Sequence, residues 1–147
     1  MARSISEVSV AEEVEPREYP TLLLVDDCVA ERDLYALTLR PRFRILTAAR
    51  GLEGLTLAIA RKPDLIVLDV KMPGLDGWET CTRIKSHPVT ADIPVILLTG
   101  CDDVDLSQHA SAVGASAVLN KPCPPERLNE QIAAALGLGP RFSFPTG

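Results

Sequence analysis

The feature that most constrains the fold is an apolar run that ends in an acid and a turn. Residues 64–77 read DLIVLDVKMPGLDG, in which four apolar residues, Leu65 to Leu68, are followed at once by Asp69. A run this short and this rich in Ile and Val is typical of a buried strand. The dipeptides PG and DG then provide turn chemistry. The pattern predicts a carboxylate at the carboxyl end of a parallel strand, where open α/β sheets bind ligands.

Four other runs have strand character, and segments with helical spacing separate them. The strand runs are Thr21–Val25, Phe43–Thr47, Ile93–Leu98 and Ala115–Leu119, and the helical segments are Cys28–Arg40, Gly51–Arg61, a short helix from Trp78 to His87-Pro88, Asp103–Val113 and a last helix from Pro124-Pro125 to Gly137. Five alternations with short connections predict an α/β fold, a doubly wound parallel sheet with helices on both faces. Right-handed crossovers place the carboxyl ends of all its strands along one edge.

The spacing of apolar residues within the helices predicts which faces pack on the sheet. Two such stripes are Val29, Leu34 and Leu37, with Leu39 as a further candidate, in the first helix and Trp78, Cys81 and Ile84 in the third. The two histidines, His87 and His109, fall at a helix end and on a polar helix position, so we expect both to be exposed to solvent.

The length of 147 residues is that of one domain with tails. Residues 1–19 are rich in Glu and Ser and show no period that would bury a face, so we expect a flexible N-terminal tail. A short amphipathic helix around Val8 to Val14 is the alternative. The domain itself is predicted over residues 20–138, and residues 139–147 are predicted to form a C-terminal tail.

Composition excludes several classes of partner. The net charge of −5 and the lack of clustered Lys and Arg argue against nucleic acid and against anionic membranes. We find neither the apolar core of a secretory signal nor a run of about 18 apolar residues, so we expect a soluble, cytoplasmic protein. Four widely spaced cysteines, without metal-ligand spacing, are consistent with reduced thiols in the cytosol.

Polar groups follow four of the five strand runs, and the topology brings them to one edge. They are Asp26, Asp27, Asp69, Thr99 and Lys121. Three carboxylates brought together either share protons or hold a cation, and Mg²⁺ prefers hard oxygen ligands of this kind. We expect Asp26 and Asp27 to position the metal and Asp69 both to contact it and to act as a nucleophile toward phosphorus. Lys121 would neutralise the transferring group, and Thr99 would donate its hydroxyl to a phosphoryl oxygen.

Each of these assignments has a simpler structural alternative. Asp26 and Asp27 could cap the first helix, since Asp is a favoured N-cap residue. Asp76 with Gly77 is expected to provide turn or N-cap chemistry for the helix that carries Trp78. A lysine at the edge of a sheet is expected to bury little surface, so Lys121 could be a solvated charge.

In this order and spacing, the motifs resemble the receiver domain of bacterial two-component response regulators, in particular the stand-alone chemotaxis type. The resemblance extends from about Thr21 to Gly137. The motifs that carry it are LLLVDD at 22–27, DLIVLDVKMPGLDG at 64–77, IPVILLTG at 93–100 and GASAVLNKP at 114–122. It implies a flavodoxin-like sheet of strand order 2-1-3-4-5 and a cis peptide bond between Lys121 and Pro122, which X-Pro bonds permit.

The resemblance also implies a function. Asp69 would accept a phosphoryl group from a sensor histidine kinase or a histidine phosphotransfer protein. Mg²⁺ would be held by Asp26 or Asp27, by Asp69 and by the backbone carbonyl of Lys71. Such a domain is a phosphoacceptor and not an enzyme, beyond phosphorylating itself from small donors and dephosphorylating itself.

The sequence departs from the family pattern at four positions. Val118 stands where the last strand usually carries a Tyr or Phe that moves inward with the threonine, and Gly100 stands where Ala is commoner. Lys71 adds a second cation near the mouth of the pocket, and Cys101 occupies a position that tunes access of hydrolytic water. The chemistry of phosphorylation is unaffected, but the usual route to the face formed by the fourth helix and fifth strand is put in question.

Several functions fit this reading. Since the chain stops within about ten residues of the last helix, we expect a regulator that binds an unidentified target protein in trans. One alternative is a phosphorelay intermediate that passes phosphate to a histidine phosphotransfer protein. Another is a receiver-like module that binds without phosphorylation; the intact acid pair, Asp69, Thr99 and Lys121 argue against it, while the lack of an aromatic at Val118 leaves it open. A Mg²⁺-dependent phosphohydrolase is disfavoured, because its usual second acid would stand where Lys71 is.

Overall fold

A computed structural model describes residues 19–100 and 105–138, and its strands form one parallel sheet. The strands are β1 (Thr21–Val25), β2 (Arg44–Ala48), β3 (Leu65–Asp69), β4 (Val95–Thr99) and β5 (Ala117–Asn120). The helices are α2 (Val29–Leu39), α3 (Gly51–Arg61), α4 (Gly77–Ser86), α5 (Leu106–Ala112) and α6 (Pro125–Leu136). The strand order is β2-β1-β3-β4-β5, so the predicted doubly wound sheet of order 2-1-3-4-5 is confirmed. Cys101 and the predicted tails, except Tyr19, lie outside the described residues.

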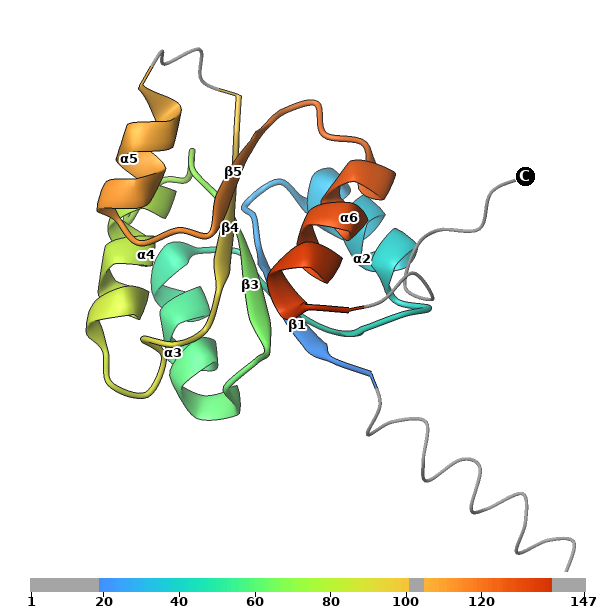
Figure 1. Cartoon of the computed structure of the whole chain (residues 1–147), viewed down its shortest axis with the longest axis horizontal. Coiled ribbons are helices and arrows are strands. Elements are labelled where there is room, and N and C mark those ends of the chain that lie inside the picture. Colours follow the sequence, from blue (N-terminus) through green and yellow to red (C-terminus); the bar gives the residue numbers. More distant parts are fainter. Residues whose placement is uncertain (1–18, 101–104, 139–147) are drawn as a thin grey trace, which may run out of the picture.

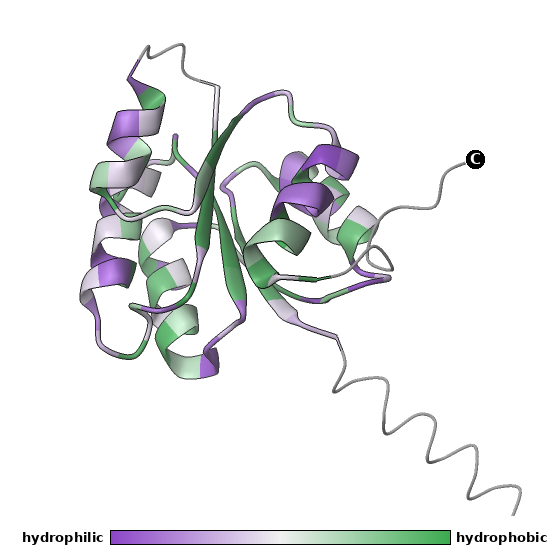
Figure 2. Cartoon of the chain, viewed as in Figure 1, coloured by the Kyte–Doolittle hydropathy of each residue, from purple (hydrophilic) through white to green (hydrophobic). Residues whose placement is uncertain are grey.

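Helices cover both faces of the sheet, as Figure 1 shows: α3, α4 and α5 on one face, α2 and α6 on the other. Successive strand residues therefore point into different cores. In β1, Leu22 and Leu24 belong to the core under α2 and α6, whereas Leu23 and Val25 belong to the core under α3 and α4. Figure 2 shows the same arrangement as apolar strands between helices with polar outer faces. Burial on both faces explains the continuous apolar runs of the strands.

Helix α2 packs through a different face from the predicted one. The residues of the predicted stripe are 58%, 53% and 67% exposed, in the order Val29, Leu34 and Leu37. Of that stripe only the further candidate, Leu39, is buried, and Tyr35 and Ala36 are buried beside it. The hydroxyl of Tyr35 donates a hydrogen bond of 2.8 Å to the carbonyl of Cys123, which fixes this face toward the segment before α6. The prediction was wrong because the helix has two apolar faces, and only tertiary contacts decide between them.

The contact between α4 and α5 involves an aromatic pair that differs from the prediction. Cys81 and Ile84 are buried as predicted, but Trp78 is half-buried and stacks on His109 with ring centroids 3.7 Å apart. The prediction that both histidines are exposed was therefore wrong: His109 is half-buried in this stack. His87 is also half-buried, and its Nδ1 accepts a hydrogen bond from a backbone N–H two residues further on.

A single residue determines where α4 begins, and another determines where α6 ends. The carboxylate of Asp76 accepts a hydrogen bond of 2.9 Å from the N–H of Glu79, which confirms Asp76 as the N-cap of α4. At the other end of the chain, Gly137 has φ +69° and ends α6. The N–H of Leu138 then bonds to the carbonyl of Ala133, as in a Schellman motif.

Gly77 is required where the loop after β3 returns to the sheet. Its N–H bonds to the carbonyl of Val70 at 2.8 Å. A Cβ at this position would lie 2.4 Å from the carbonyl oxygen of Asp69 and 2.6 Å from the Cα of Val70. These are backbone atoms and cannot move aside as the end of a side chain could. The loop therefore stays close to Asp69 only with glycine here.

We predict that Gly77→Ala lowers the free energy of unfolding by about 1–3 kcal/mol, the usual cost of a forced contact. Gly100→Ala is the matched control, because a Cβ there meets no atom of the described residues within 4 Å, its chain neighbours aside. Urea unfolding of the two variants checks this. Equal stability of the two variants would contradict the close approach of Gly77 to the end of β3.

Candidate functional site

The sheet register brings the predicted site residues to one edge. Asp69 and Thr99 are the last residues of β3 and β4, Asp26 and Asp27 follow β1, and Lys121 follows β5. Strands β3 and β4 pair in parallel, as do β4 and β5, so that these ends are level. Carboxylate oxygens of the three aspartates lie within 4.8 Å of one another. The prediction that separate segments bring the three acids together agrees with this geometry.

Two of the three aspartates are buried at this edge. Asp26 and Asp69 are 5% and 4% exposed, while Asp27 is exposed. Asp26 Oδ1 accepts a hydrogen bond of 2.9 Å from the N–H of Cys28, the residue just before α2. No side chain caps the N-terminus of α2 at Cys28. The first aspartate is therefore fixed by the turn into α2, and the alternative that it caps this helix does not describe its contact.

Burial makes the negative charge of this site costly. It raises the pKa of Asp26 to about 6, and the charges of Asp69 and Glu31 add to this effect, although the bond from Cys28 and the charge of Lys121 oppose it. Burial also raises the pKa of Asp69 above its ordinary value, with the hydrogen bond and charge of Lys121 acting in the opposite direction. A further cation near the site would stabilise the ionised forms of both carboxylates.

The residues present fit a magnesium ion. Asp26 Oδ2 is buried and has no hydrogen-bond partner among the residues that the structure describes, and the nearest ammonium, on Lys121, is 3.8 Å away. This oxygen, together with those of Asp27 and Asp69, is part of a set of hard ligands at the spacing that one ion requires. The side chain of Lys71 is exposed, and its backbone carbonyl as a further ligand stays a prediction.

Lys121 is bound to acids rather than solvated. Its Nζ lies 2.9 Å from Asp69 Oδ1 and 2.6 Å from Glu31 Oε1, and its side chain is only 20% exposed. The expectation that this lysine buries little surface was therefore wrong, because α2 supplies an acid that covers it. Burial lowers the pKa of Lys121, but the hydrogen bonds to Glu31 and Asp69 outweigh burial and raise it overall. The peptide bond from Lys121 to Pro122 is cis, as predicted.

Glu31 is the residue of this site that the sequence analysis missed. It lies in the first turn of α2, and its hydrogen bond to Lys121 holds its pKa below the ordinary value. An acid in the first turn of a helix is favoured by the helix dipole, and the sequence shows no more than this. It does not identify Lys121 as the partner.

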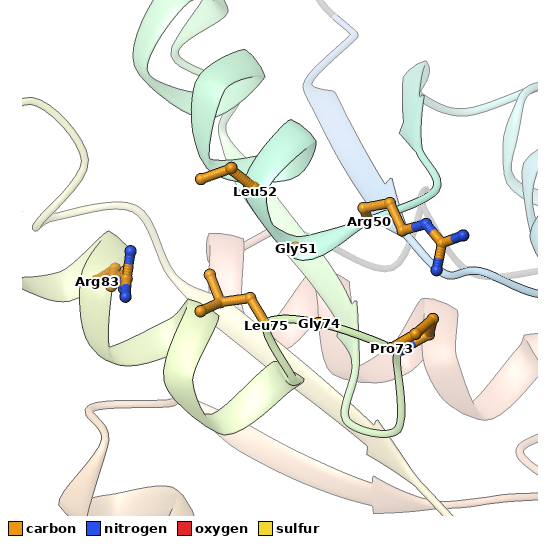
Figure 3. Close-up of a pocket in the computed structure, with 7 residues that line it drawn as sticks. All are labelled: Arg50, Gly51, Leu52, Pro73, Gly74, Leu75 and Arg83. Atoms are coloured by element: carbon orange, nitrogen blue, oxygen red, sulfur yellow. The ribbon is translucent and has the colours of Figure 1, made fainter.

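A cavity of about 520 Å³ lies beside the site and not within it. It is lined by Arg50, Gly51, Leu52, Pro73, Gly74, Leu75 and Arg83. Figure 3 shows that these residues come from the start of α3, the loop after β3 and helix α4. None of the five predicted site residues lines this cavity. This cavity is therefore separate from the charged side chains at the strand ends.

Comparison with known proteins identifies the family of this fold and site. The sequence profile of the response regulator receiver domain matches residues 22–133. The chain belongs to this family. It is 43% identical over 126 residues to the transcriptional regulatory protein AfsQ1 of Streptomyces coelicolor, covering 84% of this chain and 54% of that protein. It is 34% identical over 116 residues to protein PilH of Pseudomonas aeruginosa, covering 78% of this chain and 96% of that protein.

The solved structures agree with this assignment. Chemotaxis response regulator CheY4 of Vibrio cholerae superposes with a TM-score of 0.75 at 31% identity, covering 80% of this chain and 99% of that one. A putative response regulator from Chloroflexus aurantiacus gives 0.76 at 32% identity, covering 81% and 98%. The chain nevertheless spans only about half the length of several curated relatives, including AfsQ1.

Membership in the family sets the general chemistry of the site. Receiver domains are signalling domains of two-component systems, they are phosphorylated by histidine kinases, and they bind Mg²⁺ at an acidic pocket. Relatives with DNA-binding roles are larger proteins with further domains. Among residues 19–100 and 105–138, none of the helices has the length and apolar character needed to cross a lipid bilayer.

We predict that Asp26→Asn stabilises the metal-free protein at pH 7 by about 1–3 kcal/mol. The folded protein binds the proton of Asp26 up to about pH 6, whereas the unfolded chain releases it near pH 3.8. Asp26 therefore contributes stability below pH 4 that is lost as the pH rises to 6. The difference in unfolding free energy between variant and wild type should grow through this window and then level off.

Denaturant unfolding between pH 4 and 8 in a chelating buffer measures this difference. Asp92→Asn, at an exposed position near the amino end of β4, is the control and should show no such rise. Addition of Mg²⁺ should reduce the advantage of Asp26→Asn, because the ion replaces the missing positive charge. If the difference in unfolding free energy between Asp26→Asn and the wild type stayed constant with pH, burial would not destabilise the ionised form of Asp26.

Proposed function

We propose that this protein is a single-domain response regulator that accepts a phosphoryl group on Asp69 and signals in trans by binding a target protein. The donor is a sensor histidine kinase or a histidine phosphotransfer protein. The observation that carries the proposal is the arrangement around Asp69: two further aspartates within 4.8 Å and the ammonium of Lys121 at 2.9 Å. A purely structural edge of a sheet has no reason to gather these charges.

In the proposed reaction a carboxylate oxygen of Asp69 attacks the phosphorus atom of phosphohistidine. The new O–P bond gives an acyl phosphate, the P–N bond breaks, and its electron pair stays on the imidazole nitrogen. Lys121 is already placed on Asp69 and donates to the oxygens of the group being transferred. Thr99, buried at the end of the neighbouring strand, supplies a hydroxyl to the same oxygens.

The metal site is part of this proposal. Asp26, Asp27, Asp69 and the backbone carbonyl of Lys71 would hold Mg²⁺, which when bound neutralises charge on the phosphoryl oxygens. Asp26 also contributes to the site before a phosphoryl donor binds. Its buried Oδ2 accepts no hydrogen bond from the described residues and lies 3.8 Å from the Lys121 ammonium, so binding of a further cation there is favoured. The chemistry is that of a phosphoacceptor, and no turnover of a small substrate is proposed.

The proposal includes the domain boundaries and the location of the protein. Residues 20–138 form the receiver domain, with residues 1–19 and 139–147 as tails, and the protein acts in the cytoplasm without binding nucleic acid or membrane. In support, the match to PilH covers 96% of the length of that protein, so one relative consists of little more than this domain. The net charge of −5 is unfavourable for binding nucleic acid or anionic lipid.

We predict that wild-type protein incubated with acetyl phosphate and Mg²⁺ gains one phosphoryl group, and that Asp69→Asn gains none. An amide lacks the nucleophilic carboxylate oxygen and also removes one metal ligand. Intact-mass spectrometry at neutral pH measures the modification. Beryllofluoride, which imitates the phosphoryl group, should bind the wild type and not the variant.

Asp92→Asn is the control for loss of one acid, since this residue is exposed and lies near the opposite end of the sheet. It should be modified as fast as the wild type. Modification of Asp69→Asn at the wild-type rate would place the acceptor elsewhere and overturn the proposal.

A further inference from the structure

The hydrogen bond between Glu31 and Lys121 has no role in the reaction described so far. Glu31 Oε1 lies 2.6 Å from Lys121 Nζ, closer than the 2.9 Å between Lys121 and Asp69. Glu31 does not belong to the group of three aspartates that could hold a metal. Its side chain is 43% exposed, whereas that of Lys121 is only 20% exposed. An acid at the solvent side of the site is therefore bound to a lysine that the reaction needs.

We propose that Glu31 competes with the phosphoryl group for Lys121 and thereby slows phosphorylation of Asp69. The inference rests on the proposed function of Asp69 as the phosphoacceptor. Lys121 has three N–H groups, and in the resting structure Glu31 and Asp69 accept from two of them. Oxygens of a transferring phosphoryl group need the same donors.

The direction of the effect follows from what each state of the reaction requires. An interaction that is stronger in the resting state than in the transition state raises the barrier. The bond from Glu31 to Lys121 is complete in the resting state, and it must weaken when the ammonium turns toward the incoming group. Glu31 also adds a negative charge close to the path of an anionic donor. Both effects slow the reaction, and neither depends on which donor protein is used.

A simpler role for Glu31 would be to hold α2 against the segment that follows β5. The structure already provides that link through another pair, because the hydroxyl of Tyr35 donates to the carbonyl of Cys123 at 2.8 Å. Tyr35 is buried, and Cys123 is only two residues after Lys121. A purely structural Glu31 would therefore duplicate the link between α2 and the segment after β5 that the buried Tyr35 already provides.

Glu31→Gln tests the proposal, because glutamine keeps the size of the side chain and removes its charge. At saturating Mg²⁺ we expect acetyl phosphate to modify the variant about three to ten times faster than the wild type, as expected for removing one partly screened charge near the reacting group. Glu79→Gln is the matched control. Glu79 is also in the first turn of a helix and is also paired with a basic residue, Arg83, at 3.4 Å, but away from the site.

A double-mutant cycle shows whether the effect acts through Lys121. Lys121→Met should be modified slowly, and adding Glu31→Gln to it should give little or no gain in rate. The full three- to tenfold gain in the absence of the lysine would show a general effect of charge and would overturn competition for Lys121. An unchanged or lower rate of Glu31→Gln, relative to Glu79→Gln, would overturn the proposal as well.

Binding of Mg²⁺ alone, measured by calorimetry, gives a second readout that does not depend on phosphorylation. Loss of the charge of Glu31 makes the site less negative and leaves Lys121 to Asp69, so Mg²⁺ should bind Glu31→Gln about two to five times more weakly. The variant would then bind metal more weakly and react faster at saturation. A merely structural residue would lower both, and that result would contradict the inference.

The result for the wild type distinguishes failure of the proposed function from failure of the inference about Glu31. If acetyl phosphate modifies neither the wild type nor Glu31→Gln, the proposed function itself fails. If the wild type is modified at Asp69 and Glu31→Gln reacts no faster, the function stands and the role of Glu31 is refuted. Thermal melting of both proteins, with equal midpoints within a few degrees, shows that the comparison is between folded proteins.

Discussion

The ammonium group of Lys121 is the contact on which the geometry of the site depends. It lies between Asp69 at the end of β3 and Glu31 in the first turn of α2, at 2.9 Å and 2.6 Å, and so joins three segments that are distant in sequence. Buried carboxylates at this spacing repel one another, and one positive charge offsets only part of that repulsion. Burial, with a smaller contribution from neighbouring negative charges, keeps the pKa values of Asp26 and Asp69 raised in spite of Lys121. The site is therefore held together, yet still favours an additional cation.

The sheet keeps these charges in place although they oppose folding. Strands β3 and β4 are buried along their whole length, and each is covered by apolar residues on both faces. A shift of one residue in the pairing would exchange the two cores and is strongly disfavoured. Asp69 and Thr99 therefore stay at the ends of their strands. Stability is supplied by the layers on both sides of the sheet, and the unfavourable charges are confined to its carboxyl edge.

Much of this arrangement could be predicted from sequence, because period and spacing encode it. The five strands, their order and the acids at their ends follow from apolar runs and from the resemblance to receiver domains, and Asp76 was identifiable as an N-cap by its position. Contacts between helices were not predictable. The stripe containing Leu34 and Leu37 has the same helical spacing as a core face, yet both are exposed. Glu31 binding to Lys121, 90 residues away, leaves no local pattern at all.

The aromatic residue that contacts α5 lies on α4 in this protein, not on β5. Val118 is half-buried and packs against the core under α3, α4 and α5, and a valine has too few rotatable bonds to change position as an aromatic switch does. Helix α5 contacts β5, and it is also joined to α4 by the stack of Trp78 on His109 and by a contact of 3.4 Å from Cys81 Sγ to the carbonyl of Val113, the residue after α5. Because the two rings stack 3.7 Å apart, a shift of α5 relative to α4 would separate them.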